Sequence, residues 1–184
     1  MRYWISACAV AIVLSGCSAS ARPGKTITIR GINMENTLRS GQRVHFSAAD
    51  TSYAPAVGDI VLFKTPAEWD PSSGTTQAIS RVIAVGGQTI RGADDKVQTS
   101  TDDGKTYRTL DEPYVRLDFT SLDANFGPVT VPPGRLLLMG DHRSDSIDSR
   151  YFCDSSGSLP DPTKVCDAVK STVPTSNVVG YRRG

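Results

Sequence analysis

The chain has 184 residues, which is enough for one folded core and too few for two full domains of ordinary size. Its 20 basic and 19 acidic residues give a net charge of +1 and are spread along the chain, so there is no basic stripe of the kind that binds nucleic acid. The 16 glycines and 11 prolines, with many Val, Ile and Thr residues and no long segment of helical period, predict an all-β protein with many turns.

The N-terminal residues are typical of an exported chain. Arg2 precedes a short apolar run at residues 3–14. This run is shorter than the about 20 residues that a helix needs to span a bilayer. It therefore favours a removable signal peptide.

The tetrapeptide that follows, LSGC at residues 14–17, resembles a bacterial lipobox. We therefore expect residues 1–16 to be removed and Cys17 to carry lipid. Several acyl chains there would hold the protein at the extracytoplasmic face of the bacterial cell membrane. The alternative is an ordinary signal peptide, cut near Ala19 or Ala21.

Residues 17–25 are small and polar, a composition typical of a flexible tether. Residues 26–29 then alternate polar and apolar side chains, which predicts a first strand. We expect one folded domain over residues 26–184.

Three later segments predict strands that are joined by turns. Residues 57–64 (VGDIVLFK) and 78–90 (AISRVIAVGGQTI) each contain a buried strand in this interpretation. Residues 131–139 (VPPGRLLLM) predict a turn and a strand that leads into the polar loop GDHRSDSIDSR at residues 140–150. A solvated surface loop is one interpretation of this run, but polar loops placed by a rigid strand are also where functional groups tend to sit.

Together with GINMENTL at residues 31–38 and LDEPYV at residues 110–115, these segments resemble the motifs of the type I signal peptidases. Those enzymes are serine-lysine proteases that remove leader peptides from exported proteins. The similarity continues through residues 172–181, which look like the closing strand of the family. It therefore covers nearly the whole chain after Gly31.

The resemblance implies a signal-peptidase-like β fold with two parts. The core would contain residues 26–90 and 131–184, and a smaller accessory β lobe would contain residues 91–130. No cofactor and no metal ion are implied.

Both catalytic positions of the family are substituted in this chain. Asn33 stands where the family has its serine nucleophile, and Ser80 stands where it has the lysine general base. Asn36 replaces the proline of the first motif. A carboxamide is a poor nucleophile without an ionisable hydroxyl, so the acyl-enzyme route is closed.

Loss of both members predicts a pseudoenzyme. In another serine protease, removal of one catalytic residue lowers turnover about a millionfold. The remaining rate is only about a thousandfold above that of the uncatalysed reaction in water. The alternative is a recruited pair, with Ser80 as nucleophile and His142 or His45 as base. Ser80 would then hold its oxygen away from the oxyanion donors of the family.

Other polar residues receive supporting roles from the resemblance. Ser146 would support the ammonium of the family's lysine, so here we expect it to bond Ser80 or water instead. A charge network would hold the loops, and its pairs are Arg81 with Asp141 and Asp148 with Arg150.

Cys153 and Cys166 bracket a polar stretch near the C-terminus. In an exported chain we expect them to form a disulfide, worth about 3 kcal/mol on the chain-entropy model. A zinc site that includes His142 is the alternative.

We therefore expect a lipid-anchored pseudoprotease that keeps a groove for extended peptides and binds them by β-strand addition. Its partners would be the leader peptides of exported proteins, or a true signal peptidase that it regulates, with no role for nucleic acid. Two other classes remain open. One is an active peptidase with recruited residues, and the other is a structural protein of the cell envelope without affinity for leader peptides.

Overall fold

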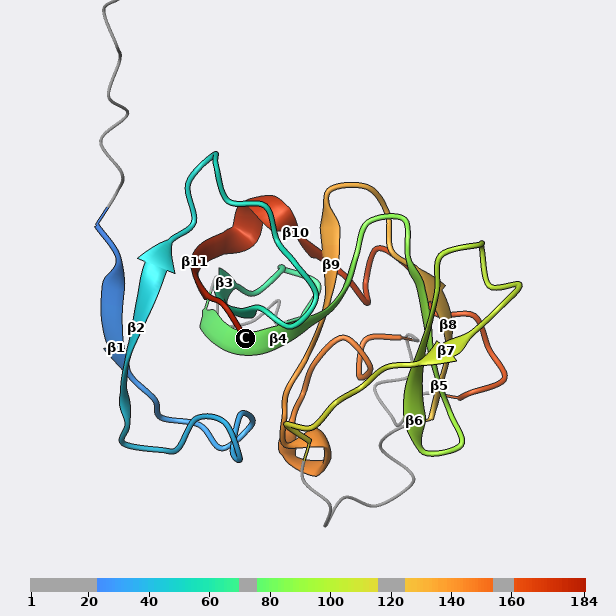
Figure 1. Cartoon of the computed structure of the whole chain (residues 1–184), viewed down its shortest axis with the longest axis horizontal. Helices are drawn as coiled ribbons and strands as arrows, with labels where there is room; N and C mark the ends of the chain where they lie inside the picture. Colours follow the sequence, from blue (N-terminus) through green and yellow to red (C-terminus); the bar gives the residue numbers. More distant parts are fainter. Residues whose placement is uncertain (1–22, 70–75, 116–124, 154–160) are drawn as a thin grey trace, which may run out of the picture.

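The computed structural model describes residues 23–69, 76–115, 125–153 and 161–184, whose strands form two antiparallel sheets (Figure 1). The larger sheet has the strand order β1-β2-β11-β3-β4-β9-β10, and the smaller has the order β7-β6-β5-β8. The larger sheet contains β1 (Lys25–Thr28), β2 (Arg43–Ala48), β3 (Ile60–Lys64), β4 (Gln77–Val85), β9 (Arg135–Met139), β10 (Val173–Pro174) and β11 (Val178–Arg182). The smaller sheet contains β5 (Thr89–Ala93), β6 (Lys96–Ser100), β7 (Arg108–Thr109) and β8 (Phe126–Thr130).

Helix is almost absent from the described ranges, which contain only the three-residue 3-10 helices η2 (Arg143–Asp145) and η3 (Thr175–Asn177). None of the described helices is long and apolar enough to cross a bilayer. The prediction of an all-β protein is therefore confirmed. The expected signal peptide and Cys17 lie outside the described residues.

The apolar patterns of the sequence explain how deeply each strand is buried. In β2 the side chains of Val44 and Phe46 are buried and their neighbours are exposed, as expected for a strand with one face in water. The continuous apolar runs Ile60–Phe63 and Leu136–Met139 are buried throughout. These runs place β3 and β9 in the middle of the molecule.

The pairing of β4 leaves part of its edge uncovered. Strand β3 pairs antiparallel with residues Gln77 to Arg81 of β4. Strand β9 pairs with β4 only from Arg81 to Val85. Residues 77–80 therefore pair with β3 on one side, and on the other side no strand of the described ranges pairs with them. This uncovered edge forms one wall of the site described below.

The smaller sheet, on the right of Figure 1, spans Thr89–Thr130, close to the accessory lobe expected at residues 91–130. It does not have a separate core. Ile90 and Phe126 of this sheet belong to the same buried cluster as Ile83 and Leu137 of the larger sheet.

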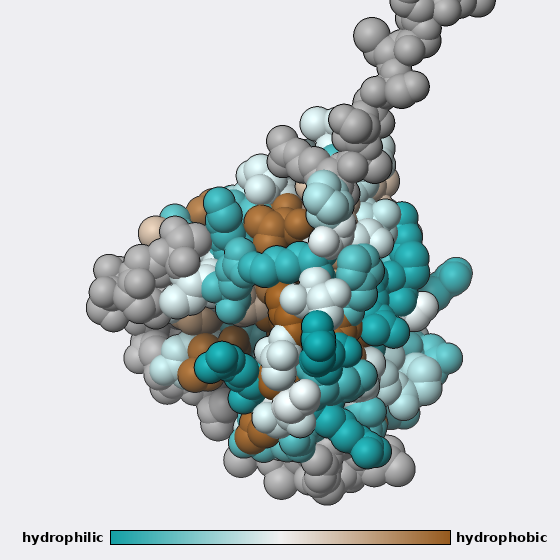
Figure 2. Space-filling view, turned by 90° about the vertical axis from the view of Figure 1, so that its left-hand side faces the viewer, coloured by the Kyte–Doolittle hydropathy of each residue, from teal (hydrophilic) through white to brown (hydrophobic). Residues whose placement is uncertain are grey.

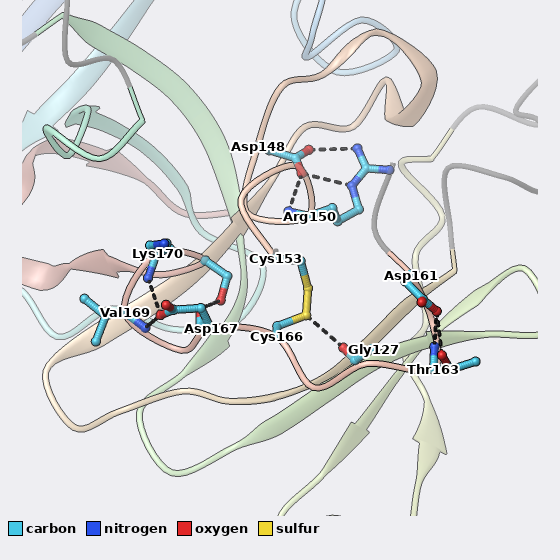
Figure 3. Close-up of a disulfide and its surroundings, with 11 residues drawn as sticks. Gly127, Asp148, Arg150, Cys153, Asp161, Thr163, Cys166, Asp167, Val169 and Lys170 are labelled. Atoms are coloured by element: carbon cyan, nitrogen blue, oxygen red, sulfur yellow. Dashed lines mark hydrogen bonds and ion pairs between the residues drawn. A yellow bond between two sulfur atoms is a disulfide. The ribbon is translucent and has the colours of Figure 1, made fainter. Parts of the chain in front are cut away.

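A disulfide joins Cys153 to Cys166, with the two Cα atoms 4.4 Å apart (Figure 3). Two backbone bonds flank it, because Cys166 N donates to Pro128 O at 3.0 Å and Asp167 N donates to Cys153 O at 2.8 Å. The expected disulfide is therefore present, and its sulfurs are not available as zinc ligands. Within the described ranges, no three His, Cys, Asp or Glu side chains converge as they would around a metal ion.

We predict that replacing both cysteines by serine (C153S with C166S) lowers the free energy of unfolding by about 2–4 kcal/mol, since the unfolded chain loses a cross-link. Urea denaturation measures this loss. Adding a reductant should reproduce it in the wild-type protein and leave the double variant unchanged. If the wild type, the reduced wild type and the double variant had the same urea midpoint, the disulfide would not be stabilising.

Candidate functional site

The loop after β1 is anchored by two apolar side chains. Met34 and Leu38 are 1% and 2% exposed and pack with Ile29 and Phe46. Asn33 directly precedes Met34, so its backbone is held against the core. Its side chain lines a groove between this loop and β4.

A second feature of this loop separates it from the family pattern. Asn36, at the family's proline position, has a φ of 90°. Proline holds φ near −65°, so it could not adopt this backbone, whereas asparagine tolerates positive φ better than most residues. The Asn36 side chain also donates from Nδ2 to Tyr114 O at 3.2 Å.

The side chains of Asn33 and Ser80, which the resemblance assigns to the family's dyad, meet at one backbone oxygen. Asn33 Nδ2 donates to Ile79 O at 2.7 Å, and Ser80 Oγ donates to the same oxygen at 2.9 Å. The fold thus brings the first motif and β4 together at these two residues. Neither side chain bonds to the other, because both donate to Ile79.

No described group is placed to remove a proton from Ser80, which is 4% exposed. None of the chain's six lysines is buried, and all lie in the described ranges. His45 Nδ1 forms a hydrogen bond with Thr26 Oγ1 at 3.2 Å, and both residues are exposed. His142 has Nε2 2.9 Å from Asp145 Oδ2 and Nδ1 3.3 Å from Ile32 O. The recruited pair of Ser80 with a histidine therefore has no hydrogen bond in this structure.

Ser146 lies beside the first motif without a hydrogen bond of its own. Its hydroxyl is buried and has no partner of normal geometry among the described residues, although it lies close enough to help to lower the pKa of Asp148. A Cβ on Gly140 would collide with this hydroxyl and with the Asn33 carbonyl, so only glycine allows this close approach. The expected bond from Ser146 to Ser80 is not made, because the Ser80 hydroxyl donates to Ile79 instead.

The pair formed by Arg81 and Asp141 is buried at 5% and 0% side-chain exposure. The guanidinium donates to both carboxylate oxygens, from Nε at 2.8 Å and from Nη2 at 2.6 Å. Thr37 also donates to Asp141, and Arg81 Nη1 donates to Gly58 O at 2.8 Å. The face of the same guanidinium lies 3.8 Å from the ring centre of Tyr114.

Asp148 and Arg150 form a second buried pair (Figure 3). Arg150 donates from Nε at 2.9 Å and from Nη2 at 2.8 Å to the two carboxylate oxygens, and Gly140 N donates to Asp148 at 2.9 Å. Burial alone raises the pKa of the Asp148 carboxyl, but the charge and hydrogen bonds of Arg150 and the Gly140 N–H outweigh burial. The pKa of Asp148 is held below its ordinary value as a result.

A third ion pair, between buried Arg143 and partly buried Glu112, was not foreseen from the sequence. Arg143 donates to Glu112 from Nη1 at 3.1 Å and from Nη2 at 2.5 Å, and its Nε donates to Gly140 O at 2.9 Å. Burial lowers the pKa of Arg143, but the carboxylate of Glu112 more than offsets this and raises it. Residues 110–115, which we expected to belong to the accessory lobe, therefore help to hold the polar loop in place. The sequence shows a glutamate in the LDEPYV motif and an arginine in the polar loop, but no spacing that pairs them.

The groove beside Asn33 has a volume of about 610 Å³. Its walls are the end of β1 with the following loop, residues 27–34, and the uncovered edge of β4 at Gln77–Ile79, with Leu62 between them. Asp145 and Ile147 of the polar loop complete the lining. Figure 2 views the molecule from the side of β1, where hydrophobic side chains show through a mainly hydrophilic surface.

We predict that Asp148→Asn lowers the free energy of unfolding at pH 7 by about 3–5 kcal/mol, because it removes the buried carboxylate that pairs with the Arg150 guanidinium. Since the folded pKa of Asp148 is depressed, its contribution is complete above the unfolded pKa of about 3.9 and is lost as the pH falls through the folded value. Urea titrations between pH 2 and pH 7 should therefore show a flatter acid dependence in the variant.

A matched variant separates charge burial from general damage. Asp148→Asn combined with Arg150→Met removes the guanidinium together with its carboxylate partner, so we expect it to be more stable than Asp148→Asn alone. Wild-type stability in Asp148→Asn at pH 7 would show that the pair is not structurally important.

Comparisons with known proteins agree with the motifs. The family model described as signal peptidase, peptidase S26, matches residues 1–183. A probable signal peptidase I of Mycobacterium leprae (strain TN) is 36% identical over an aligned length of 165, and the alignment covers 71% of this chain and 55% of that protein. A signal peptidase I of Mycobacterium tuberculosis (strain H37Rv) is 33% identical over an aligned length of 169, and the alignment covers 71% of this chain and 51% of that protein. The chain thus spans about half the length of these relatives.

A shorter relative and a solved structure complete the comparison. A signal peptidase I of Bacillus licheniformis is 30% identical over an aligned length of 156, and the alignment covers 80% of this chain and 76% of that protein. A crystal structure of a signal peptidase I from Enterococcus faecalis V583 aligns at 21% identity and a TM-score of 0.47, over 71% of this chain and 97% of that one. The family model, the relatives and the motifs lead to one conclusion: the chain belongs to the signal peptidase family, peptidase S26.

Proposed function

We propose that this chain is a pseudoprotease that binds extended leader-type peptides and does not cleave them. The observation that carries the proposal is the pair of hydrogen bonds by which Asn33 and Ser80 both donate to Ile79 O. Two side chains that use their donors on a backbone oxygen do not form a nucleophile and a base.

The chemistry of the two side chains supports the absence of cleavage. A serine protease needs a hydroxyl and a group that takes its proton, and each group must lie within hydrogen-bond reach of the other. Asn33 has no hydroxyl, and Ser80 has no lysine or histidine bonded to it. Loss of one such member already lowers turnover by about a millionfold in another serine protease.

The groove supports binding of an extended peptide. Residues 77–80 of β4 have β3 on one side only, and β1 is the outermost strand of its sheet. A peptide between these two edges can bond through its main chain as an added strand. Ile27, Ile29, Ile32, Ile79 and Ile147 line the groove, so it suits apolar side chains.

The names of the relatives suggest the source of such peptides. Signal peptidases act on the leader peptides of exported proteins, and we propose the same peptides as ligands here. In our proposal Cys17 carries lipid after removal of residues 1–16, which places the domain at the outer face of the bacterial cell membrane.

We predict that restoring both catalytic positions (N33S with S80K) gives measurable cleavage of a leader peptide, while the wild type and each single variant show little or none. The reason is that burial at position 80 depresses the pKa of a lysine and supplies the base that Ser80 cannot. We expect the double variant to cleave the leader peptide about a thousandfold faster than the wild type, or more. Mass spectrometry of the cut peptide measures the rate.

One further variant sharpens this test. Ser146→Ala added to the double variant should reduce the gain, because the family resemblance assigns Ser146 to the support of the lysine ammonium, and its hydroxyl is buried without a partner of normal geometry among the described residues. Asn36 stays unchanged, since its φ of 90° excludes proline. Cleavage by the wild-type protein at the rate of an active peptidase would end the pseudoprotease proposal.

The lipid anchor has a separate test. We predict that cells fed with labelled fatty acid incorporate label into the wild-type protein, and that Cys17→Ser abolishes both the label and sedimentation with membranes. The reason is that the thiol is the acylation site of a lipobox. Equal labelling of both proteins would exclude Cys17 as the attachment point.

A further inference from the structure

The carbonyl of Ile79 belongs to the uncovered edge of β4. Val82 donates its N–H to Asp59 O at 2.8 Å and accepts from Gly58 N at 2.8 Å, so the backbone groups of Val82 point toward the β3 side. Backbone groups alternate between the two sides of a strand, so those of Ser80 also face β3 and those of Ile79 face away from it. Pairing with β9 begins only at Arg81. An added peptide strand would therefore reach Ile79 O from the groove.

This acceptor is already fully used by the protein itself. Asn33 Nδ2 lies 2.7 Å from Ile79 O, and Ser80 Oγ lies 2.9 Å from it. A carbonyl oxygen has two lone pairs, so two hydrogen bonds exhaust its capacity. A peptide N–H that approaches this oxygen finds no acceptor unless one of the two side chains withdraws.

We propose that Asn33 determines which peptides bind, because it caps the edge of β4 at Ile79. This inference rests on the peptide-binding function proposed above. A bound peptide pairs with the remaining groove edges and needs no N–H opposite Ile79. The wild-type protein therefore accepts peptides with proline, or any residue without an N–H, at that one position.

The test uses a series of synthetic leader peptides, each N-methylated at one successive amide. Asn33→Ala frees one lone pair of Ile79 O, so we expect about two- to tenfold tighter binding of the unmodified peptide, the size of one net hydrogen bond. N-methylation of the one peptide amide that faces Ile79 O should remove this gain in affinity. The wild type should be insensitive to N-methylation at that same position, as measured by fluorescence anisotropy.

Asn36→Gly is the matched control. It removes another asparagine-to-carbonyl hydrogen bond of the same loop, from Asn36 Nδ2 to Tyr114 O, and glycine keeps the positive φ. Since Asn36 does not line the groove, this variant should show the wild-type pattern across the series. Asn33→Leu removes the donor with less loss of volume and should reproduce Asn33→Ala if the alanine variant folds poorly.

Each outcome separates the two proposals. Identical N-methylation profiles for the wild type, Asn33→Ala and Asn33→Leu would overturn the cap and leave peptide binding intact. If N-methylation of the peptide amide opposite Ile79 weakened binding equally in the wild type and in Asn33→Ala, Asn33 would have to withdraw on binding. That result would also overturn the cap. If no protein in the set binds any peptide, the cap and the proposed peptide-binding function both fail.

Discussion

The buried ion pair of Arg81 with Asp141 connects the segments that form the site. The guanidinium is taken out of water, so each of its donors needs a partner inside the protein. It finds them in three separate segments, namely the carboxylate of Asp141, the turn at Gly58 and the hydroxyl of Thr37. Tyr114 covers one of its faces. Arg81 therefore holds four segments together around one guanidinium. They are the polar loop after β9, the first motif, β4 and the turn before β3.

Much of this arrangement could be predicted from local sequence patterns. The apolar runs within residues 57–64 and 131–139 became β3 and β9, because a continuous run of this length between turns fills a sheet that is buried on both faces. The polar loop at residues 140–150 follows β9, as its position in the sequence indicated. The two charge pairs expected there are formed, and in each pair the two partners lie within motifs that the family resemblance identified.

Other features had no local signal. The bond between Glu112 and Arg143 joins residues 31 positions apart in sequence, and neither has a spacing that predicts the other. The φ of 90° at Asn36 depends on how the loop closes against its neighbours and not on the identity of the residue alone. The acceptor of Asn33 is a backbone carbonyl, and a backbone group is the same at every position of a sequence. Only the fold shows that Ile79 supplies it.

The oxygen that Asn33 and Ser80 share also bears on how such a chain could evolve. A lysine at position 80 alone would bury an amine beside a carboxamide, with a cost in stability and no hydroxyl to activate. A serine at position 33 alone would supply a hydroxyl that no neighbouring base could ionise. Neither change alone supplies both a nucleophile and its base, so under the function proposed above only a simultaneous change at both positions would restore cleavage.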